Sequence, residues 1–240
     1  MRKSNAVILF AFGLLVVLII AGVLVTRLTL GGLLDQAQSS DNPAGAPNTG
    51  DWTDKTFGLE GFSGIRAGGA WHIRLKQDDD YKVSVRMPAD MTEQVIVRIH
   101  GDLLELDMKP GIIYAGLARE ADISLPRITV IEASGGAEFE LTGFKGGSLK
   151  VDATGAVKLH GKDNRFTDFS LDSSGASQVR LMGNPTVNAD LNLSGASDVE
   201  LTMAGGNLSG SVSGAGKVIY DGEVTVQNVD VSGIGMVRRR

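Results

Sequence analysis

The fold of this chain is decided by residues 151–200, which read VDATGAVKLHGKDNRFTDFSLDSSGASQVRLMGNPTVNADLNLSGASDVE. A short motif occurs three times in this stretch: a hydroxyl residue, then glycine, then alanine. Related copies lie on both sides, so that the motif occurs six times with glycine spacings of 20, 20, 20, 19 and 19 residues. The motif glycines are Gly135, Gly155, Gly175, Gly195, Gly214 and Gly233.

Apolar residues flank the motif at nearly constant offsets. Around Gly155 they are Val151, Ala153 and Leu159, and polar residues separate them. Period-two alternation is typical of strands with one buried face, and a fixed repeat of this length is typical of a solenoid. We therefore predict an all-β fold: a parallel β-solenoid, right-handed and β-helix-like, with coils of roughly 20 residues stacked about 4.8 Å apart.

The motif itself is interpreted as a corner of each coil. A glycine column suits a place where a side chain would not fit or where φ is positive. The hydroxyl before each glycine can bond neighbouring backbone groups, and we favour this structural role because one catalytic serine does not need five copies. This hydroxyl column consists of Ser134, Thr154, Ser174, Ser194, Ser213 and Ser232.

An outward column of polar residues lies two positions before the hydroxyl column. Stacked carboxylates roughly 5 Å apart would repel one another by about 1–3 kcal/mol per contact. The column could bind a cation or a row of sugar hydroxyls, or it could splay into solvent, which is the favoured interpretation. We call it the polar ladder, and its residues are Glu132, Asp152, Asp172 and Asn192.

Residues 57–130 repeat less regularly and are predicted to form a hairpin-rich part that caps the solenoid. Residues 72–76 and 81–85 alternate as strands on either side of an aspartate turn at 78–80. A solenoid needs such a cap because its end coils carry unpaired edges. The repeat part follows as residues 131–240.

Residues 1–34 are predicted to form a signal anchor whose apolar run, residues 6–25, crosses a bilayer as one helix. Twenty helical residues measure about 30 Å, which matches the bilayer core, and a cleaved signal peptide is the alternative. Because Arg2 and Lys3 precede the run, the N-terminus is expected in the cytoplasm and the β domain in the periplasm or outside. Residues 35–56 are small and polar and are expected to be a flexible linker.

Further local features accompany the repeated motif. They are the run Phe62-Ser63-Gly64-Ile65, the strand pair around residues 78–81 and the Leu125-Pro126 step. Together with the Ser-Gly-Ala motifs, they resemble the putative auto-transporter adhesin head domain (GIN) family over about residues 57–237. The resemblance implies a bacterial envelope domain of β-solenoid type behind a signal sequence or anchor. The chain departs from the family in its long anchor and in its degenerate last motif, Gly233-Ile234-Gly235.

Composition and motifs argue against most catalytic functions. The 240 residues carry a net charge of −5 and no cysteine, which excludes disulfide scaffolds, cysteine nucleophiles and thiolate metal sites, and leaves no basic surplus for nucleic acid. His72, His100 and His160 lack metal-ligand spacing and are interpreted as surface or turn residues. We therefore predict no catalytic residue, no metal and no cofactor.

The predicted function is that of a non-catalytic, adhesin-like binding or structural module of the bacterial cell envelope. It is expected to be a single-pass protein of the cytoplasmic membrane, anchored through residues 6–25, with an envelope or surface component such as a glycan as its ligand. One alternative is a homo-oligomeric scaffold of stacked solenoids, and another is a carbohydrate-active β-helix enzyme with clustered carboxylates. The enzyme requires aromatic sugar platforms, whereas the aromatic residues after position 130 are placed for core or corner packing. These residues are Phe139, Phe144, Phe166, Phe169 and Tyr220.

Overall fold

The computed structural model describes residues 51–110 and 118–240. These residues form fourteen strands and one short 3₁₀ helix, and none of their helical segments is long and apolar enough to cross a bilayer. The predicted all-β fold is confirmed, whereas the predicted span at residues 6–25 lies outside the described residues. The elements are β1 (Trp52–Phe57), β2 (Gly64–Gly68), β3 (Trp71–Gln77), β4 (Lys82–Pro88), η2 (Ala89–Met91), β5 (Val95–His100), β6 (Leu103–Met108), β7 (Arg119–Leu125), β8 (Val130–Thr142), β9 (Ser148–Lys162), β10 (Phe166–Ala204), β11 (Asn207–Gly214), β12 (Lys217–Glu223), β13 (Val226–Gly233) and β14 (Met236–Arg239).

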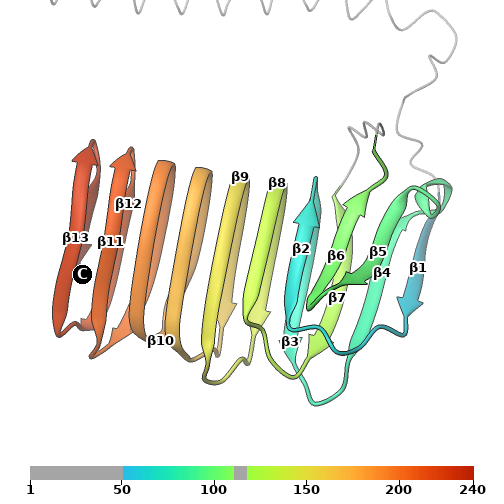
Figure 1. Cartoon of the computed structure of the whole chain (residues 1–240), viewed down its shortest axis with the longest axis horizontal. Helices are drawn as coiled ribbons and strands as arrows, with labels where there is room; N and C mark the ends of the chain where they lie inside the picture. Colours follow the sequence, from blue (N-terminus) through green and yellow to red (C-terminus); the bar gives the residue numbers. More distant parts are fainter. Residues whose placement is uncertain (1–50, 111–117) are drawn as a thin grey trace, which may run out of the picture. The chain divides into compact units, whose positions relative to one another are not determined.

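Each coil of the solenoid consists of two strand segments that meet at a glycine corner. In β8, the residues before Gly135 pair with β2 and the residues after Gly136 pair with β3. Buried residues alternate with outward residues along both halves, so that one core lies between two sheet faces. We call the segments before the corner the first face and the segments after it the second face. The corners form the upper edge in Figure 1.

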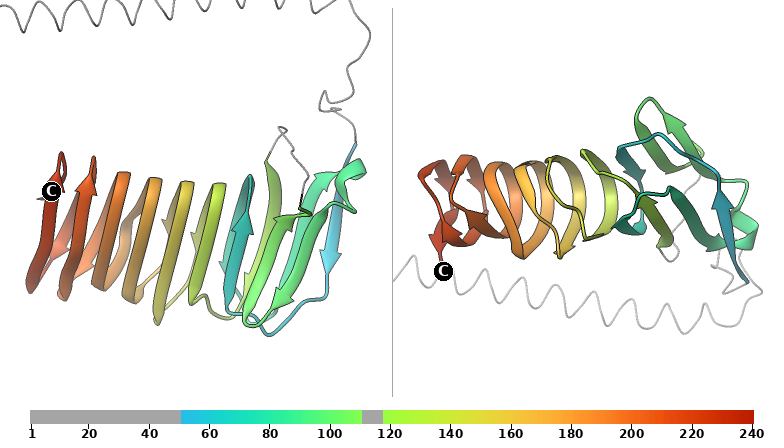
Figure 2. Two further views of the ribbon diagram at one scale, coloured as in Figure 1. Left: turned by 45° about the horizontal axis from the view of Figure 1, so that its top comes forward. Right: turned by 90° about the horizontal axis from the view of Figure 1, so that it is seen from below.

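Successive coils stack in parallel with the register that the sequence period predicts. Gly135 pairs with Gly155, and Gly195 pairs with Gly214, which in turn pairs with Gly233. The stack runs from β8 through β9 and β10 to β11 and β13 on the first face, and to β12 and β14 on the second face. The predicted parallel β-solenoid is therefore confirmed (Figures 1 and 2), and its handedness stays a prediction.

Apolar columns fill the interior on both faces. Towards the C-terminal end, Val229 and Val237 are only partly buried, because β13 and β14 each pair with one strand among the described residues. Val231, which was predicted to face inward two positions before Gly233, is 46% exposed, so the prediction is wrong for that residue. For the apolar residues of the earlier coils, the inward columns that the motif offsets predict are confirmed. Their buried members include Ile131, Val151, Leu171 and Leu191 on the first face and Phe139, Leu159, Val179, Val199 and Val218 on the second.

Residues 64–77 form a complete coil that the repeated motif does not reveal. β2 and β3 pair in parallel with the two halves of β8, and Gly69 lies at the corner, where its amide donates to the Ser134 carbonyl at 2.9 Å. Gly68 stands opposite Ser134, so this corner lacks the hydroxyl that marks the other coils. The solenoid therefore includes one coil from the part of the chain that was predicted only as a cap.

The chain between β3 and β8 closes the N-terminal end of the stack. β6 and β7 add a further parallel layer outside β2 and β3, and β5, β4 and β1 then pair antiparallel. The predicted hairpin of residues 72–76 and 81–85 is wrong, because β7 lies between β3 and β4 and pairs with both. β1 begins at Trp52, inside the stretch predicted as linker.

A ladder of buried asparagines holds the edge opposite the glycine corners. The backbone amide of Phe144 donates to Asn164 Oδ1 at 2.9 Å, and the backbone amide of Asn164 donates to Asn184 Oδ1 at 2.9 Å. Asn164 Nδ2 also donates to the Leu141 carbonyl at 2.8 Å. Both asparagine side chains are almost fully buried. They accept hydrogen bonds from the amides of Phe144 and Asn164, which lie outside the strands, so these buried backbone groups have partners. The sequence motif does not predict this ladder.

Candidate functional site

The glycine corners are positions that admit no side chain. Gly155 has a φ of +108°, and a Cβ there would lie 2.6 Å from the carbonyl oxygen of Gly135 in the preceding coil. Both reasons proposed for the glycine column, a positive φ and a lack of space, therefore apply together. The hydroxyl column contributes hydrogen bonds between coils, because Ser194 and Ser213 donate to the carbonyls of Ser173 and Leu193 at 3.2 and 3.3 Å.

The polar ladder runs across the first face in the predicted register. Glu132 pairs with Asp152, and Asp152 pairs with Asp172, so the three carboxylates stack on adjacent coils. Asn192 Nδ2 donates to Asp172 Oδ1 at 3.1 Å, and Ser211 Oγ lies 3.3 Å from Asn192 Oδ1. The structure thus brings all four predicted residues into one continuous outward column.

Basic side chains form ion pairs with the stacked carboxylates of the polar ladder. Arg66 Nε lies 2.7 Å from Glu132 Oε2, and Lys150 Nζ lies 3.0 Å from Asp152 Oδ1 and 3.5 Å from Asp172 Oδ2. The hydrogen bond to Glu132 raises the pKa of Arg66, and the hydrogen bond to Asp152 raises the pKa of Lys150. These two cations therefore offset part of the repulsion expected from the three stacked carboxylates.

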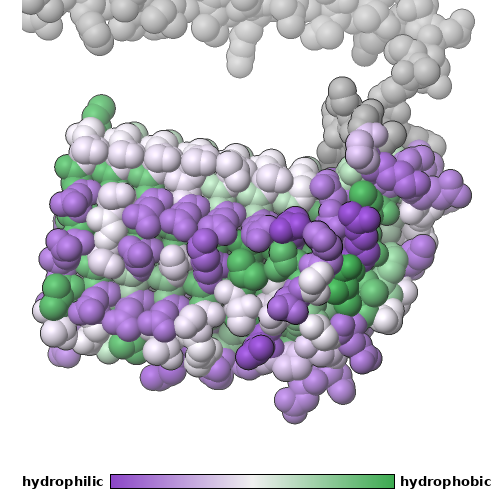
Figure 3. Space-filling view, in the orientation of Figure 1, coloured by the Kyte–Doolittle hydropathy of each residue, from purple (hydrophilic) through white to green (hydrophobic). Residues whose placement is uncertain are grey.

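A shallow groove follows the polar ladder and the hydroxyl column along the first face. One section, of about 300 Å³, lies among Glu132, Ser134, Asp152 and Thr154. The next section, of about 330 Å³, continues past Asp172 to Asn192 and Ser194. In Figure 3 hydrophilic side chains form rows that cross the strands of this face. The groove therefore presents carboxylates or amides along one side and hydroxyls along the other.

A second outward polar row lies on the first face and was missed in the sequence. Ser148 Oγ donates to Asp168 Oδ2 at 2.9 Å, and Asn188 Nδ2 donates to Asp168 Oδ1 at 2.9 Å. The backbone amide of Asn207 then donates to Asn188 Oδ1 at 3.1 Å. The hydrogen bonds from Asn188 and Ser148 lower the pKa of Asp168. The 20-residue period could have identified this row, because its members recur at the same spacing as the motif.

The second face carries paired charges rather than a single polar column. Arg180 contacts Asp198 at 2.9 Å and Glu200 at 3.6 Å, so residues of opposite charge pair across neighbouring coils here. Nearer the N-terminal end, Arg74 contacts Asp122 at 2.5 Å and Glu120 at 3.0 Å.

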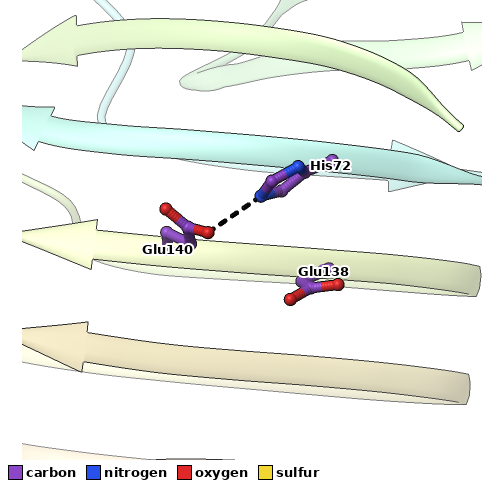
Figure 4. A group of neighbouring side chains, drawn as sticks. All are labelled: His72, Glu138 and Glu140. Carbon is purple, nitrogen blue, oxygen red and sulfur yellow. Dashed lines mark hydrogen bonds and ion pairs between the residues drawn. The ribbon is translucent and has the colours of Figure 1, made fainter.

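Two of the three histidines flank a pair of glutamates on the second face. His72 Nε2 lies 3.0 Å from Glu140 Oε1, and His160 Nε2 lies 3.9 Å from Glu138 Oε1. His72, Glu138 and Glu140 each offer a ligand atom within 4.8 Å of the other two (Figure 4). The sequence interpretation treated these histidines as isolated because their partners lie on other coils.

Comparison with known proteins supports the fold and gives the family. A family model described as "Putative auto-transporter adhesin, head GIN domain" matches residues 61–186. The crystal structure of a putative adhesin from Bacteroides fragilis NCTC 9343 is similar at a TM-score of 0.62 and 13% identity, over 79% of this chain and 97% of that chain. A putative adhesin from Parabacteroides merdae ATCC 43184 gives a TM-score of 0.48 at 17% identity, over 80% and 97% of the two chains. A search of curated proteins finds no match.

The family match and the structural likeness carry different weight. At 13% identity the likeness to the Bacteroides fragilis protein shows a shared fold and nothing about a ligand. The family model spans both the coil of β2 and β3 and the first repeats after β8. Because it matches more than half of the 240 residues, the chain belongs to the putative auto-transporter adhesin, head GIN domain family.

Proposed function

We propose that this chain is a non-catalytic, adhesin-like binding module of the bacterial cell envelope, and that its first face carries the ligand site. Membership of a family named for adhesin heads supports the class of function. The observation that carries the site is the groove between the polar ladder and the hydroxyl column. The proposed ligand is an extended, hydroxyl-rich polymer such as a surface glycan.

The repeat of the groove explains why an extended polymer fits it. Coils stack about 4.8 Å apart, so the same pair of polar groups recurs at that interval along the axis. A polymer with regularly spaced hydroxyls can therefore form equivalent hydrogen bonds on successive coils, and their sum gives affinity although each exposed bond contributes little. Stacking on aromatic rings plays no part in the repeat, because its five aromatic residues are buried in the core.

The test is a binding screen of the purified full-length chain in detergent against glycans and envelope fractions. The double variant Thr154→Val with Asp172→Asn removes a hydroxyl and a charge from the groove without changing side-chain volume much. Glu200→Gln, on the second face, is the matched control. We expect at least a tenfold weaker affinity for the double variant and a change of less than twofold for the control. Binding that the double variant leaves intact would overturn the assignment to the first face.

We also propose that residues 6–25 anchor the module in the cytoplasmic membrane, with the N-terminus inside and the β domain outside. The length of the apolar run and the positive residues before it support this topology. Protease added to intact spheroplasts should degrade residues 57–240. Full protection of these residues in spheroplasts, with cleavage after lysis, would refute the topology.

A scaffold of stacked solenoids is a second candidate function, favoured by the open C-terminal coil. β13 pairs only with β11 and β14 only with β12 among the described strands, and Val226, Ile234 and Met236 are 51%, 89% and 51% exposed there. Open strand edges and exposed apolar side chains favour pairing with another chain. Sedimentation should then detect oligomers that Ile234→Lys with Met236→Lys dissociates. A monomer at all concentrations would exclude this function.

A further inference from the structure

The second face brings potential metal ligands together from three coils. β8 supplies Glu138 and Glu140, which point to the same side because residues i and i+2 of a strand share a face. His72 on β3 pairs in register with Glu138, and His160 on β9 pairs in register with Glu140. Two carboxylates on one strand are therefore flanked by an imidazole on each neighbouring strand, and Figure 4 shows the side of His72.

The separation of these groups suits a shared cation. The ligand atoms of His72, Glu138 and Glu140 lie within 4.8 Å of one another, and His72 Nε2 is already 3.0 Å from Glu140 Oε1. Zinc bonds of about 2.0–2.2 Å place neighbouring ligand atoms roughly 3–3.5 Å apart. All three side chains are only partly buried, so small rotations about their side-chain bonds can close the difference.

The surrounding charges leave the two glutamates without a strong basic partner. Arg74 stands opposite Glu140 in the register but forms its ion pairs with Glu120 and Asp122 instead. Lys158, opposite Glu138, is exposed to solvent. The ion pairs of Glu138 and Glu140 in the described part of the chain are with histidines. This differs from the polar ladder, where Arg66 and Lys150 compensate the carboxylates.

We propose that His72, Glu138 and Glu140 form a three-ligand binding site for a divalent transition-metal ion, with Zn²⁺ as the best match. One imidazole nitrogen and two carboxylate oxygens suit Zn²⁺ better than Ca²⁺ or Mg²⁺, which prefer oxygen ligands alone. Water completes the coordination because the site is open to solvent. His160, with Nε2 at 3.9 Å from Glu138 Oε1, lies beside the site on the next coil.

The site has a consequence for the architecture. His72 belongs to the coil of β2 and β3, whereas Glu138 and Glu140 belong to β8, and 68 positions separate His72 from Glu140 in the sequence. A metal ion bound to both strands would clamp the first coil to the repeat part at a place where the chain itself makes no short connection. Metal binding should therefore raise the free energy of unfolding of the folded chain.

The experiment measures metal binding to the untagged, chelator-treated full-length chain by isothermal titration calorimetry and thermal unfolding. We expect one Zn²⁺ per chain, a higher Tm with Zn²⁺, and no comparable effect of Mg²⁺. His72→Ala and Glu140→Gln should each weaken Zn²⁺ binding at least tenfold, and a circular dichroism spectrum without metal establishes that each variant is folded. His100→Ala is the matched control, because His100 ends β5 in the cap hairpin.

Several results would overturn the site. They are wild-type Zn²⁺ affinity in both His72→Ala and Glu140→Gln, loss of binding in His100→Ala, or no Zn²⁺ binding by the wild-type chain at millimolar metal. Co²⁺ provides a second readout, since its visible absorption spectrum reports the ligands directly and should disappear in His72→Ala. The outcome is independent of the glycan screen, because the two sites lie on different faces.

Discussion

The glycine corner yields the sharpest prediction about stability. In Gly155→Ala the new Cβ lies 2.6 Å from the carbonyl oxygen and 2.9 Å from the amide nitrogen of Gly135, and the backbone keeps a φ of +108°. An L-residue in this conformation costs about 1–2 kcal/mol. Overpacking against a backbone that cannot move aside costs about 1–3 kcal/mol more. We therefore expect the free energy of unfolding to fall by about 2–5 kcal/mol.

Two matched glycines separate the contributions to this cost. Gly143 has a φ of +83°, but a Cβ added there would have no atom within 4 Å, so Gly143→Ala should cost only the conformational part, about 1–2 kcal/mol. Gly136 has neither a positive φ nor a neighbour within 4 Å of its Cβ position. Gly136→Ala should therefore be neutral or stabilise by up to about 1 kcal/mol, through the unfolded chain.

Urea unfolding, followed by circular dichroism, measures all three variants. With a slope of about 2–3 kcal/mol per molar urea, the midpoint of Gly155→Ala should fall by roughly 1–2 M. The slope must stay unchanged for this comparison, because a solenoid can lose cooperativity along its stack. A cost for Gly155→Ala of under about 1 kcal/mol, or one equal to that of Gly136→Ala, would refute the stacking of corners as the reason for the glycine column.

Three further predictions concern the polar groups. Asn184→Ala should lower the free energy of unfolding by about 2–4 kcal/mol in urea, because buried backbone groups lose their partners. Asn188→Ala should change it far less, because the hydrogen bonds of this partly buried side chain are exposed to solvent. The hydrogen bond from Arg74 lowers the pKa of Asp122, so this pair stabilises the fold above about pH 4 and the stabilisation disappears as pH falls through the lower, folded-state pKa. Urea midpoints between pH 7 and pH 2 should accordingly converge for the wild type and Asp122→Asn at the acid end, and a constant difference would contradict the pairing. Lys150→Met removes the cation between two ladder carboxylates, so the urea midpoint should fall at low ionic strength and recover partly in 0.5 M salt; a midpoint insensitive to salt would contradict the electrostatic cause.

The repeat part of the fold was predictable because its contacts repeat with the sequence. Each coil touches only its neighbours, so a residue and its spatial partner lie one period apart, as Asp152 and Asp172 do. The six corner glycines, the inward columns and the polar ladder follow from that single relation. The basic partners of the polar ladder were harder to predict. Lys150 contacts Asp152 on its own strand and Asp172 on the next coil, whereas Arg66 belongs to the coil of β2 and β3, which lacks the motif.

The cap and the candidate metal site could not be predicted in the same way. β7 separates β3 from β4, although the residues on either side of the aspartate turn read as a hairpin. Pairing with β7 buries Ile73 and Val83 in one continuous core, and local alternation is the same whichever strand is the partner. The ligands His72 and Glu138 are likewise far apart in the chain and share no motif.

By itself the sequence determined the all-β class, the parallel coils, their register and the residues of the glycine corners. It could do so because a solenoid translates a constant period directly into contacts between neighbouring coils. Only the tertiary structure decided that the coil of β2 and β3 joins the stack, that Arg66 and Lys150 form ion pairs with the polar ladder, and that His72 contacts Glu140. These contacts join segments with no fixed separation in the chain, so they depend on which strands the common core brings together rather than on any local pattern.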